Sequence, residues 1–292
     1  MKRRHHELPR HYLRGFCELG TGFIWVYEQG KPFSPGEKRE TSNPHRRGIH
    51  VTALRRDRYA ARGEDGRIHF RYEPELQRKE RLADDVIRKV RNHEPISADE
   101  KEVLARYIGL MMRRLSDRDV DARPRLRQVL SVSPMYKIAQ QLADAGQFGK
   151  ARELLDAQDR LETEDGQTEL LRESMLIDFD QVHSAIMGIA WRFLVAPPER
   201  HFITTDNPVV FDRHQGLRNS PLLFPLSSTI MLDASRFNGH DLTYEQASIL
   251  ETRKFNAMVM THAVKEIYSA RPDEWILARW QDGFAHGIDH DA

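Results

Sequence analysis

Two adjacent histidines, His5 and His6, lie among other polar residues close to the start of the chain. Tyr12 and Arg14 follow them. Neighbouring imidazoles titrate near neutrality, so they can transfer protons or ligate a metal ion, and an arginine can bind an anion. Apolar residues such as Phe16 are interspersed with them and favour a packed segment, although a flexible basic amino terminus would have a similar composition.

A second candidate group follows a hydrophobic run much later in the chain. Asp206 and Asn207 precede Pro208 and follow the strand-like residues 201–205. Asp and Asn before proline form turns readily, because their side chains bond nearby backbone amides. A carboxylate at the end of a buried strand is also rigidly held, as a metal ligand or general base must be. The sequence leaves both interpretations of Asp206 open.

These candidate residues lie in segments with different hydrophobic patterns. Alternating aromatic and β-branched residues over 22–27 predict a strand, and apolar residues at helical spacing predict helices, one of them starting at a capping box from Ser97 to Glu100. A long helical pattern extends over 176–195. The patterns divide the chain into an amino-terminal β segment (1–72), a helical block (74–195), a carboxy-terminal β/α segment (200–280) and a frayed tail (286–292).

This order of segments predicts an α+β fold in a single domain, 1–292. The helices form one block and do not alternate with strands, which argues against a doubly wound sheet. We expect a mainly helical middle and a small, mostly antiparallel sheet built from the amino-terminal and carboxy-terminal segments. Within the last segment, a helix over 244–263 and a closing strand near 276–278 are predicted.

Composition excludes several classes of protein. The 292-residue chain has a single cysteine, which rules out an intrachain disulfide and a thiolate-rich zinc or iron–sulfur site. No apolar run is long enough for a transmembrane helix and no signal peptide is expected, so we predict no membrane association and a cytoplasmic location. Glycine-rich nucleotide-binding motifs, the G-x-S-x-G elbow and the H-E-x-x-H motif are missing from the sequence.

Charge is unevenly distributed along the chain. The net charge is only +1, but residues 1–127 carry a net charge of +10 and residues 128–292 a net charge of −9. A basic half can attract phosphate or nucleic acid. Alternatively, the two halves pack together and neutralise one another.

Several blocks of the sequence resemble a known family. The opening from His5 to Phe16 is similar to the H-H-Y-V-P-x-x-Y-L-x-x-F start of the bacterial proteins grouped as domain of unknown function 4238. The run from Phe202 to Val209 is the other specific block. Weaker matches complete the likeness over almost the whole chain: Trp25-Val26-Tyr27, Glu80 with Leu82-Ala83, Tyr107-Ile108 with Arg113, Trp191, Pro225-Leu226-Ser227, and Asn256 before Glu266-Ile267-Tyr268.

The resemblance implies that polar residues from distant parts of the chain form one recurring constellation, without implying a reaction. One pocket explains scattered polar positions more economically than separate structural roles do. The residues of this constellation are His5, His6, Tyr12, Arg14, Glu80, Arg113, Asp206, Asn207 and Asn256.

Our leading hypothesis is a phosphoester hydrolase, either a nuclease or a nucleotide phosphodiesterase, in a toxin or phage-defence setting. Arg14 and Arg113 would bind phosphate, while His5, His6 and Asp206 would transfer protons or hold a divalent metal as cofactor. Tyr12, Glu80, Asn207 and Asn256 would complete the substrate site. Nucleic acid or a nucleotide would be the partner.

The rival hypothesis is a non-catalytic binding protein, in which the same residues form a closed hydrogen-bond network that fixes the amino terminus on the core and the basic half docks a partner. A third hypothesis is a nucleic-acid binder without catalysis, whose affinity would depend strongly on salt. An enzyme needs a solvent-open pocket lined by the histidines and Asp206, whereas a structural network is internally satisfied.

Overall fold

A computed structural model describes residues 4–28, 43–56, 61–62, 68–69, 73–113, 135–163, 180–212, 215–217, 220–235 and 241–281. The chain divides into two compact units. The first comprises Met1–Arg58, Gln77–Met112 and Asp178–Ala292, and the second comprises Tyr59–Leu76 and Arg113–Ile177. The expectation of a single domain stays a prediction. The predicted tail, 286–292, lies outside the described residues.

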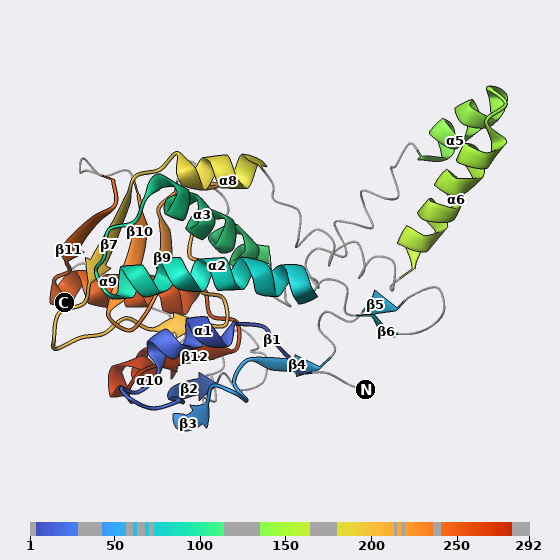
Figure 1. The fold of residues 1–292 in the computed structure, drawn as a ribbon. Helices are drawn as coiled ribbons and strands as arrows, with labels where there is room; N and C mark the ends of the chain where they lie inside the picture. Colours follow the sequence, from blue (N-terminus) through green and yellow to red (C-terminus); the bar gives the residue numbers. More distant parts are fainter. Residues whose placement is uncertain are drawn as a thin grey trace. The chain divides into compact units, whose positions relative to one another are not determined.

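One sheet of the first unit joins the two ends of the chain, as predicted (Figure 1). Its four strands are, in spatial order, β3 (His45–Gly48), β2 (Phe23–Glu28), β12 (Glu266–Ser269) and β8 (Thr204–Thr205), and all neighbours are antiparallel. The strand predicted over 22–27 is therefore confirmed as β2. The register places Glu28 opposite Glu266 and Thr204 opposite Tyr268.

A second sheet of four strands follows the order β11 (Thr243–Gln246), β7 (Trp191–Val195), β10 (Ile230–Ala234) and β9 (Leu222–Pro225). Only the β11–β7 pair is parallel. All residues of β9 and β10 are buried, which explains why their sequences are apolar except for Asp233 of β10, which pairs with Arg192. Together the sheets and helices make the predicted α+β fold.

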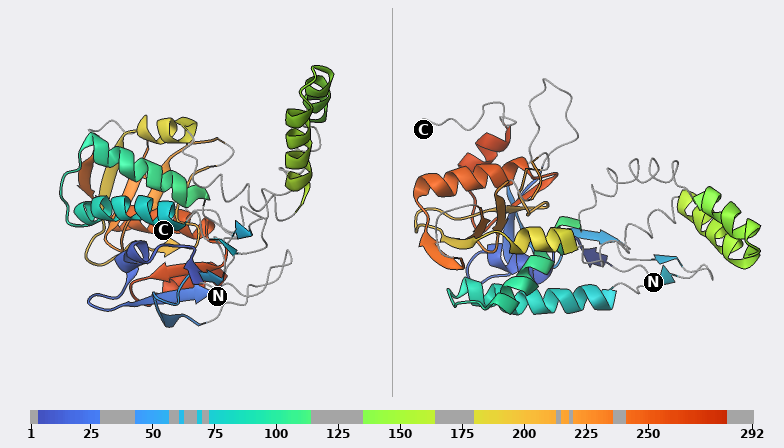
Figure 2. Two further views of the ribbon diagram at one scale, coloured as in Figure 1. Left: turned by 45° about the vertical axis from the view of Figure 1, so that its right-hand side comes forward. Right: turned by 90° about the horizontal axis from the view of Figure 1, so that it is seen from above.

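The consecutive helices α2 and α3 belong mainly to the first unit. Figure 2 shows this pair on one side of the strands and α9 on the other. The capping box predicted at the second helix is present, since Ser97 Oγ accepts from the amide of Glu100, and Glu100 Oε2 accepts from that of Ser97. The helices that lie wholly or mainly in this unit are α1 (Arg10–Leu13), the 3-10 turn η1 (Arg14–Phe16), α2 (Glu73–Arg91), α3 (Ala98–Arg113), α8 (Asp180–Met187), α9 (Ile249–Thr261) and α10 (Glu274–Gln281).

Three predicted elements differ from the structure. The helical block does not reach residue 195, because α8 ends at Met187 and residues 191–195 form β7, where they pair with both β10 and β11. The helix predicted from residue 244 begins at Ile249, because the preceding residues form β11. The closing strand predicted near 276–278 is instead the helix α10, whose Ile276 is fully buried. Short apolar runs fit a strand or a buried helix equally well, and tertiary pairing decides between them.

The second unit contains a helical hairpin and a small ribbon. Helix α5 (Met135–Asp144) packs against α6 (Phe148–Glu162), and Ala139 of α5 and Ala151 of α6 are buried. Gly146 between them has a φ of +74°, a conformation that glycine adopts readily. Strands β5 (Ala61–Arg62) and β6 (Ile68–His69) pair antiparallel. No helix among the described residues of the chain is long and apolar enough to cross a membrane.

The amino-terminal segment is packed into the first unit. Strand β1 (Arg4–His6) pairs with β4 (Leu54–Arg56), and α1 and η1 bury Tyr12, Leu13 and Phe16 completely. A β-carbon added at Gly15 would lie 2.7 Å from Cζ of Arg91 and 2.8 Å from the carbonyl oxygen of Leu226. The absence of a side chain at Gly15 therefore permits this packing.

We expect Gly15→Ala to lower the free energy of unfolding by about 1–3 kcal/mol, because the methyl group overlaps a buried guanidinium and a backbone carbonyl. Urea unfolding monitored by circular dichroism measures the change. Gly22→Ala is the matched control, since a β-carbon there has no neighbour within 4 Å. Equal stability of the two variants would contradict the close packing at Gly15.

Candidate functional site

Tyr12 connects the amino-terminal helix to both sheets. Its hydroxyl lies 2.8 Å from the carbonyl oxygen of Pro225, to which it donates, and 2.7 Å from Oγ1 of Thr204. Its ring stacks on Phe224 with the ring planes 7° apart. Complete burial raises the pKa of Tyr12 well above its ordinary value. The tyrosine predicted to bind substrate is thus bound to the protein's own strands.

The buried guanidinium of Arg91 fixes the same segment from the end of α2. It donates to the carbonyl oxygen of Leu226 from Nη2 at 2.6 Å and from Nε at 2.9 Å. Nη2 and Nη1 also donate to the carbonyls of Tyr12 and His11, at 3.1 and 3.3 Å. Burial lowers the pKa of Arg91. Sequence reasoning missed this residue, because the carbonyls that bind it come from distant segments.

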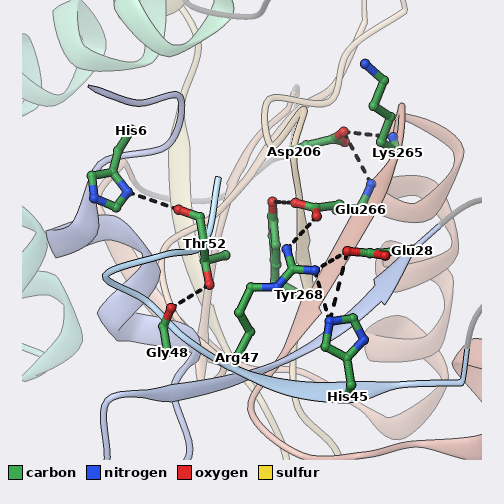
Figure 3. Close-up of polar contacts among 10 residues, drawn as sticks. All are labelled: His6, Glu28, His45, Arg47, Gly48, Thr52, Asp206, Lys265, Glu266 and Tyr268. Atoms are coloured by element: carbon green, nitrogen blue, oxygen red, sulfur yellow. Dashed lines mark hydrogen bonds and ion pairs between the residues drawn. The ribbon is translucent and has the colours of Figure 1, made fainter. Parts of the chain in front are cut away.

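Asp206 uses both carboxylate oxygens to bind backbone amides at the start of β12 (Figure 3). Oδ1 accepts from Val264 at 2.9 Å, and Oδ2 accepts from Lys265 at 2.7 Å and from Glu266 at 3.3 Å. Burial raises the pKa of Asp206 to about 7, assisted by the negative charge of Glu266 and opposed by the amide bonds. A carboxyl with this pKa exchanges a proton near neutrality.

A network of charged side chains lies on the face of the first sheet that carries Glu28, Arg47 and Glu266. The Arg47 guanidinium bridges Glu28 and Glu266, with 2.7 Å from Nη1 to Oε1 of Glu266 (Figure 3). His45 Nε2 lies 2.9 Å from Arg47 Nη2, and the Tyr268 hydroxyl donates to Glu266. The side chains of His45 and Arg47 are 42% and 21% exposed, so solvent reaches part of this network.

Sequence reasoning did not assign Glu28, His45 or Arg47 to the site. Strand alternation could have placed them on one face, since the register pairs Glu28 with Glu266 and Val26 with His45. The pairing itself joins residues from opposite ends of the chain, and no local signal specifies it.

The two groups predicted to act together bind different backbone segments. His6 Nδ1 lies 3.0 Å from the carbonyl oxygen of Thr52, and Thr52 Oγ1 donates to the carbonyl of Gly48. Figure 3 shows the His6 ring directed at Thr52 and Asp206 directed at the backbone of Lys265. His5 pairs with Arg55 in the β1–β4 ribbon.

Asn256 binds the backbone through its side chain, whereas Asn207 bonds through its own backbone amide and its buried Oδ1 has no hydrogen-bond partner among the described residues. The Asn256 side chain accepts from the amide of Ile203 at 3.1 Å and donates to the carbonyl of His201 at 2.8 Å. The amide of Asn207 donates to Oγ1 of Thr205, which is the local bond expected of a turn. Both asparagines are buried.

The remaining predicted residues lie elsewhere on the helices. Arg14 is exposed in η1, Glu80 is half-buried in α2, and Arg113 is the last residue of α3. In the part of the chain that the structure describes, no group of three or more His, Cys, Asp or Glu side chains is placed to hold a metal ion. Asp206 in particular has its oxygens bonded to amides, which is a poor fit to a metal ligand.

Fold and site together define an α+β protein in which buried polar side chains fix an amino-terminal segment and a short strand by bonding to the backbone. The chain belongs to the family described as protein of unknown function (DUF4238), whose model matches residues 4–273. No curated protein and no solved structure matches the chain.

The raised pKa of Asp206 predicts a stability that falls with rising pH. An unfolded aspartate has a pKa of 3.8, so the folded state binds the extra proton between that value and about 7. The stabilisation is complete below pH 3.8 and lost as pH rises through 7. Between pH 5 and pH 8, we expect the contribution of Asp206 to the free energy of unfolding to fall by about 2–3 kcal/mol.

Urea unfolding of the wild type and of Asp206→Asn at both pH values isolates this contribution. The difference in stability between the two proteins should shrink by that amount at pH 8. Asp85→Asn, at an exposed position of α2, is the control and should leave the pH response unchanged. A wild-type response retained in Asp206→Asn would assign the titration to another group.

Proposed function

We propose that this protein acts by binding a partner and that its polar constellation is a structural network. The observation that carries this proposal is the bonding of Asp206, whose carboxylate accepts three backbone amides. Tyr12 and Asn256 are likewise bonded to backbone carbonyls or amides. Groups engaged in this way organise the fold, and a reacting substrate would have to displace their bonds.

The uneven charge supports a partner with a negatively charged surface. Arg10 and Arg14 are exposed and lie four positions apart in α1 and η1, so they project from neighbouring turns. The bonds of Arg91 and Tyr12 hold this segment in place, which fixes the positions of both arginines. Guanidinium groups bind phosphate oxygens through paired hydrogen bonds, and nucleic acid is the partner that best fits this charge.

Binding to labelled single-stranded and double-stranded RNA and DNA, measured by fluorescence anisotropy between 50 and 300 mM salt, tests the proposed partner. We expect affinity to fall steeply with salt, and the double variant Arg10→Glu/Arg14→Glu to weaken binding at least about tenfold. Arg253→Glu/Lys254→Glu, an equal change of charge at two exposed positions of α9, is the control. Unchanged affinity in the double variant, or the absence of any binding, would refute the proposed surface and partner.

A phosphoester hydrolase is the second candidate, favoured by one observation. The pKa of Asp206 is raised to about 7, as suits a general acid or base at neutral pH. In this proposal His5 or His6 and Asp206 transfer protons, Arg14 and Arg113 bind the phosphate, and the substrate is RNA, DNA or a nucleotide. A role in a toxin or phage-defence system belongs to the same proposal.

A screen of RNA, DNA and cyclic nucleotides, with and without added divalent metal, separates the two candidates. The binding proposal expects no turnover, and expects Asp206→Asn to lose about 2 kcal/mol of stability at pH 5, because the new amide group meets backbone donors. Cleavage that disappears in folded His6→Ala and Asp206→Asn variants would establish the hydrolase and overturn the binding proposal.

A further inference from the structure

Ser269, His201 and Asp273 form a separate buried cluster at the amino-terminal end of α10. His201 Nε2 lies 2.7 Å from Oγ of Ser269, and His201 Nδ1 lies 3.6 Å from Oδ2 of Asp273. Both Nδ1 and Oδ2 are buried, and neither has a hydrogen-bond partner in the structure. The cluster joins the loop after β7, the end of β12 and the residue that precedes α10.

The order Ser–His–Asp is that of a nucleophilic triad, but the serine is not offered to a substrate. Ser269 is completely buried, and Arg271 covers it, since its carbonyl oxygen lies 2.8 Å from Oγ of Ser269. A nucleophile must reach the reacting carbon, so catalysis is excluded in this conformation. The arrangement must be understood through the bonds that it makes within the fold.

These bonds attach α10 to the rest of the first unit. Asp273 donates its backbone amide to the Tyr27 hydroxyl at 2.7 Å, and its side chain faces His201. Arg271 donates to the carbonyl of Glu199, next to the histidine loop. Beyond these polar contacts, Ile276 inserts into the hydrophobic core. His201 therefore lies at the centre of the polar contacts that hold α10, and Ile276 supplies the apolar contact.

The surroundings of His201 favour its neutral form. Burial is the dominant effect and lowers the pKa of His201 to about 4. The charges of Arg271 and Arg200 lower the pKa further, and only Asp273 opposes them. Asn256 of α9 contacts the backbone of His201 and carries no charge. Burial raises the pKa of Tyr27 to about 12, so Tyr27 stays neutral below that pH.

We propose that His201 is an acid-sensitive latch that holds α10 on the core while it is neutral and releases it when it is protonated. In the closed state, the neutral ring bonds to Ser269 and faces Asp273. In the open state, solvent surrounds the ring and accommodates its charge. Protons therefore bind preferentially to the open state, and acid shifts the equilibrium towards it.

The sign and size of the effect follow from the two protonation equilibria. An exposed histidine has an ordinary pKa of 6.5, whereas the closed state holds it at about 4. The free-energy difference that favours the closed state decreases as pH falls from 6.5 towards 4. Between pH 7 and pH 5, the ratio of open to closed molecules should rise roughly 20-fold.

Amide hydrogen exchange of α10 measures this ratio directly. Exchange of the α10 amides at pH 7 and pH 5, corrected for intrinsic rates, should show the 20-fold rise in opening in the wild type. His201→Gln cannot bind the proton and should lose the pH dependence. Asp273→Asn retains His201 and should therefore keep the pH dependence of α10 exchange. His50→Gln, at an exposed turn position, is the control for removing a histidine and should behave like the wild type.

Acid-enhanced exchange of α10 that persists in His201→Gln would overturn the latch. If that variant does not fold at pH 7, the histidine ring signals of the wild type in a pH titration by NMR decide the question. A His201 ring that becomes charged while the α10 amides stay protected would also refute the proposal.

Discussion

The segment from His201 to Asp206 is the constraint on which the two sheets of the first unit depend. Its strand, β8, is only two residues long, so ladder hydrogen bonds alone give it little stability. Side chains supply the missing bonds. Tyr12 binds Thr204, Asn256 binds the backbone on either side of Phe202, and Asp206 binds the amides that begin β12. Each bond comes from a different element, so the short strand is held from several directions.

Arg91 likewise holds the amino-terminal segment by hydrogen bonds from its side chain to the backbone. A guanidinium removed from water must keep its donors bonded, and here the acceptors are backbone carbonyls of α1 and of the chain after β9. Gly15 leaves the space that the guanidinium needs. Because one side chain serves several backbone segments, losing it would expose several acceptors at once, and the segments would lose a common support.

The sequence predicts those elements of the fold whose signals lie within a few neighbouring residues. The alternation over residues 22–27 identifies β2, and Ser97 with Glu100 marks the start of α3, because both signals lie within a few residues. The pattern over Trp191–Val195 predicts a helix, yet these residues form a strand between β10 and β11. Its apolar residues fit either element, and the partners that decide lie about forty to fifty positions later.

Identifying the polar positions was easier than assigning their roles. The resemblance named Tyr12, Asp206 and Asn256 from residue types alone, but a hydroxyl or carboxylate serves catalysis and backbone anchoring equally well. The distinction lies in the bonding partners. Asp206 binds amides almost sixty residues away, and Tyr12 binds a carbonyl more than two hundred residues away. A constellation spread along a sequence therefore identifies a common structural neighbourhood, and its function follows from which polar atoms the backbone already occupies.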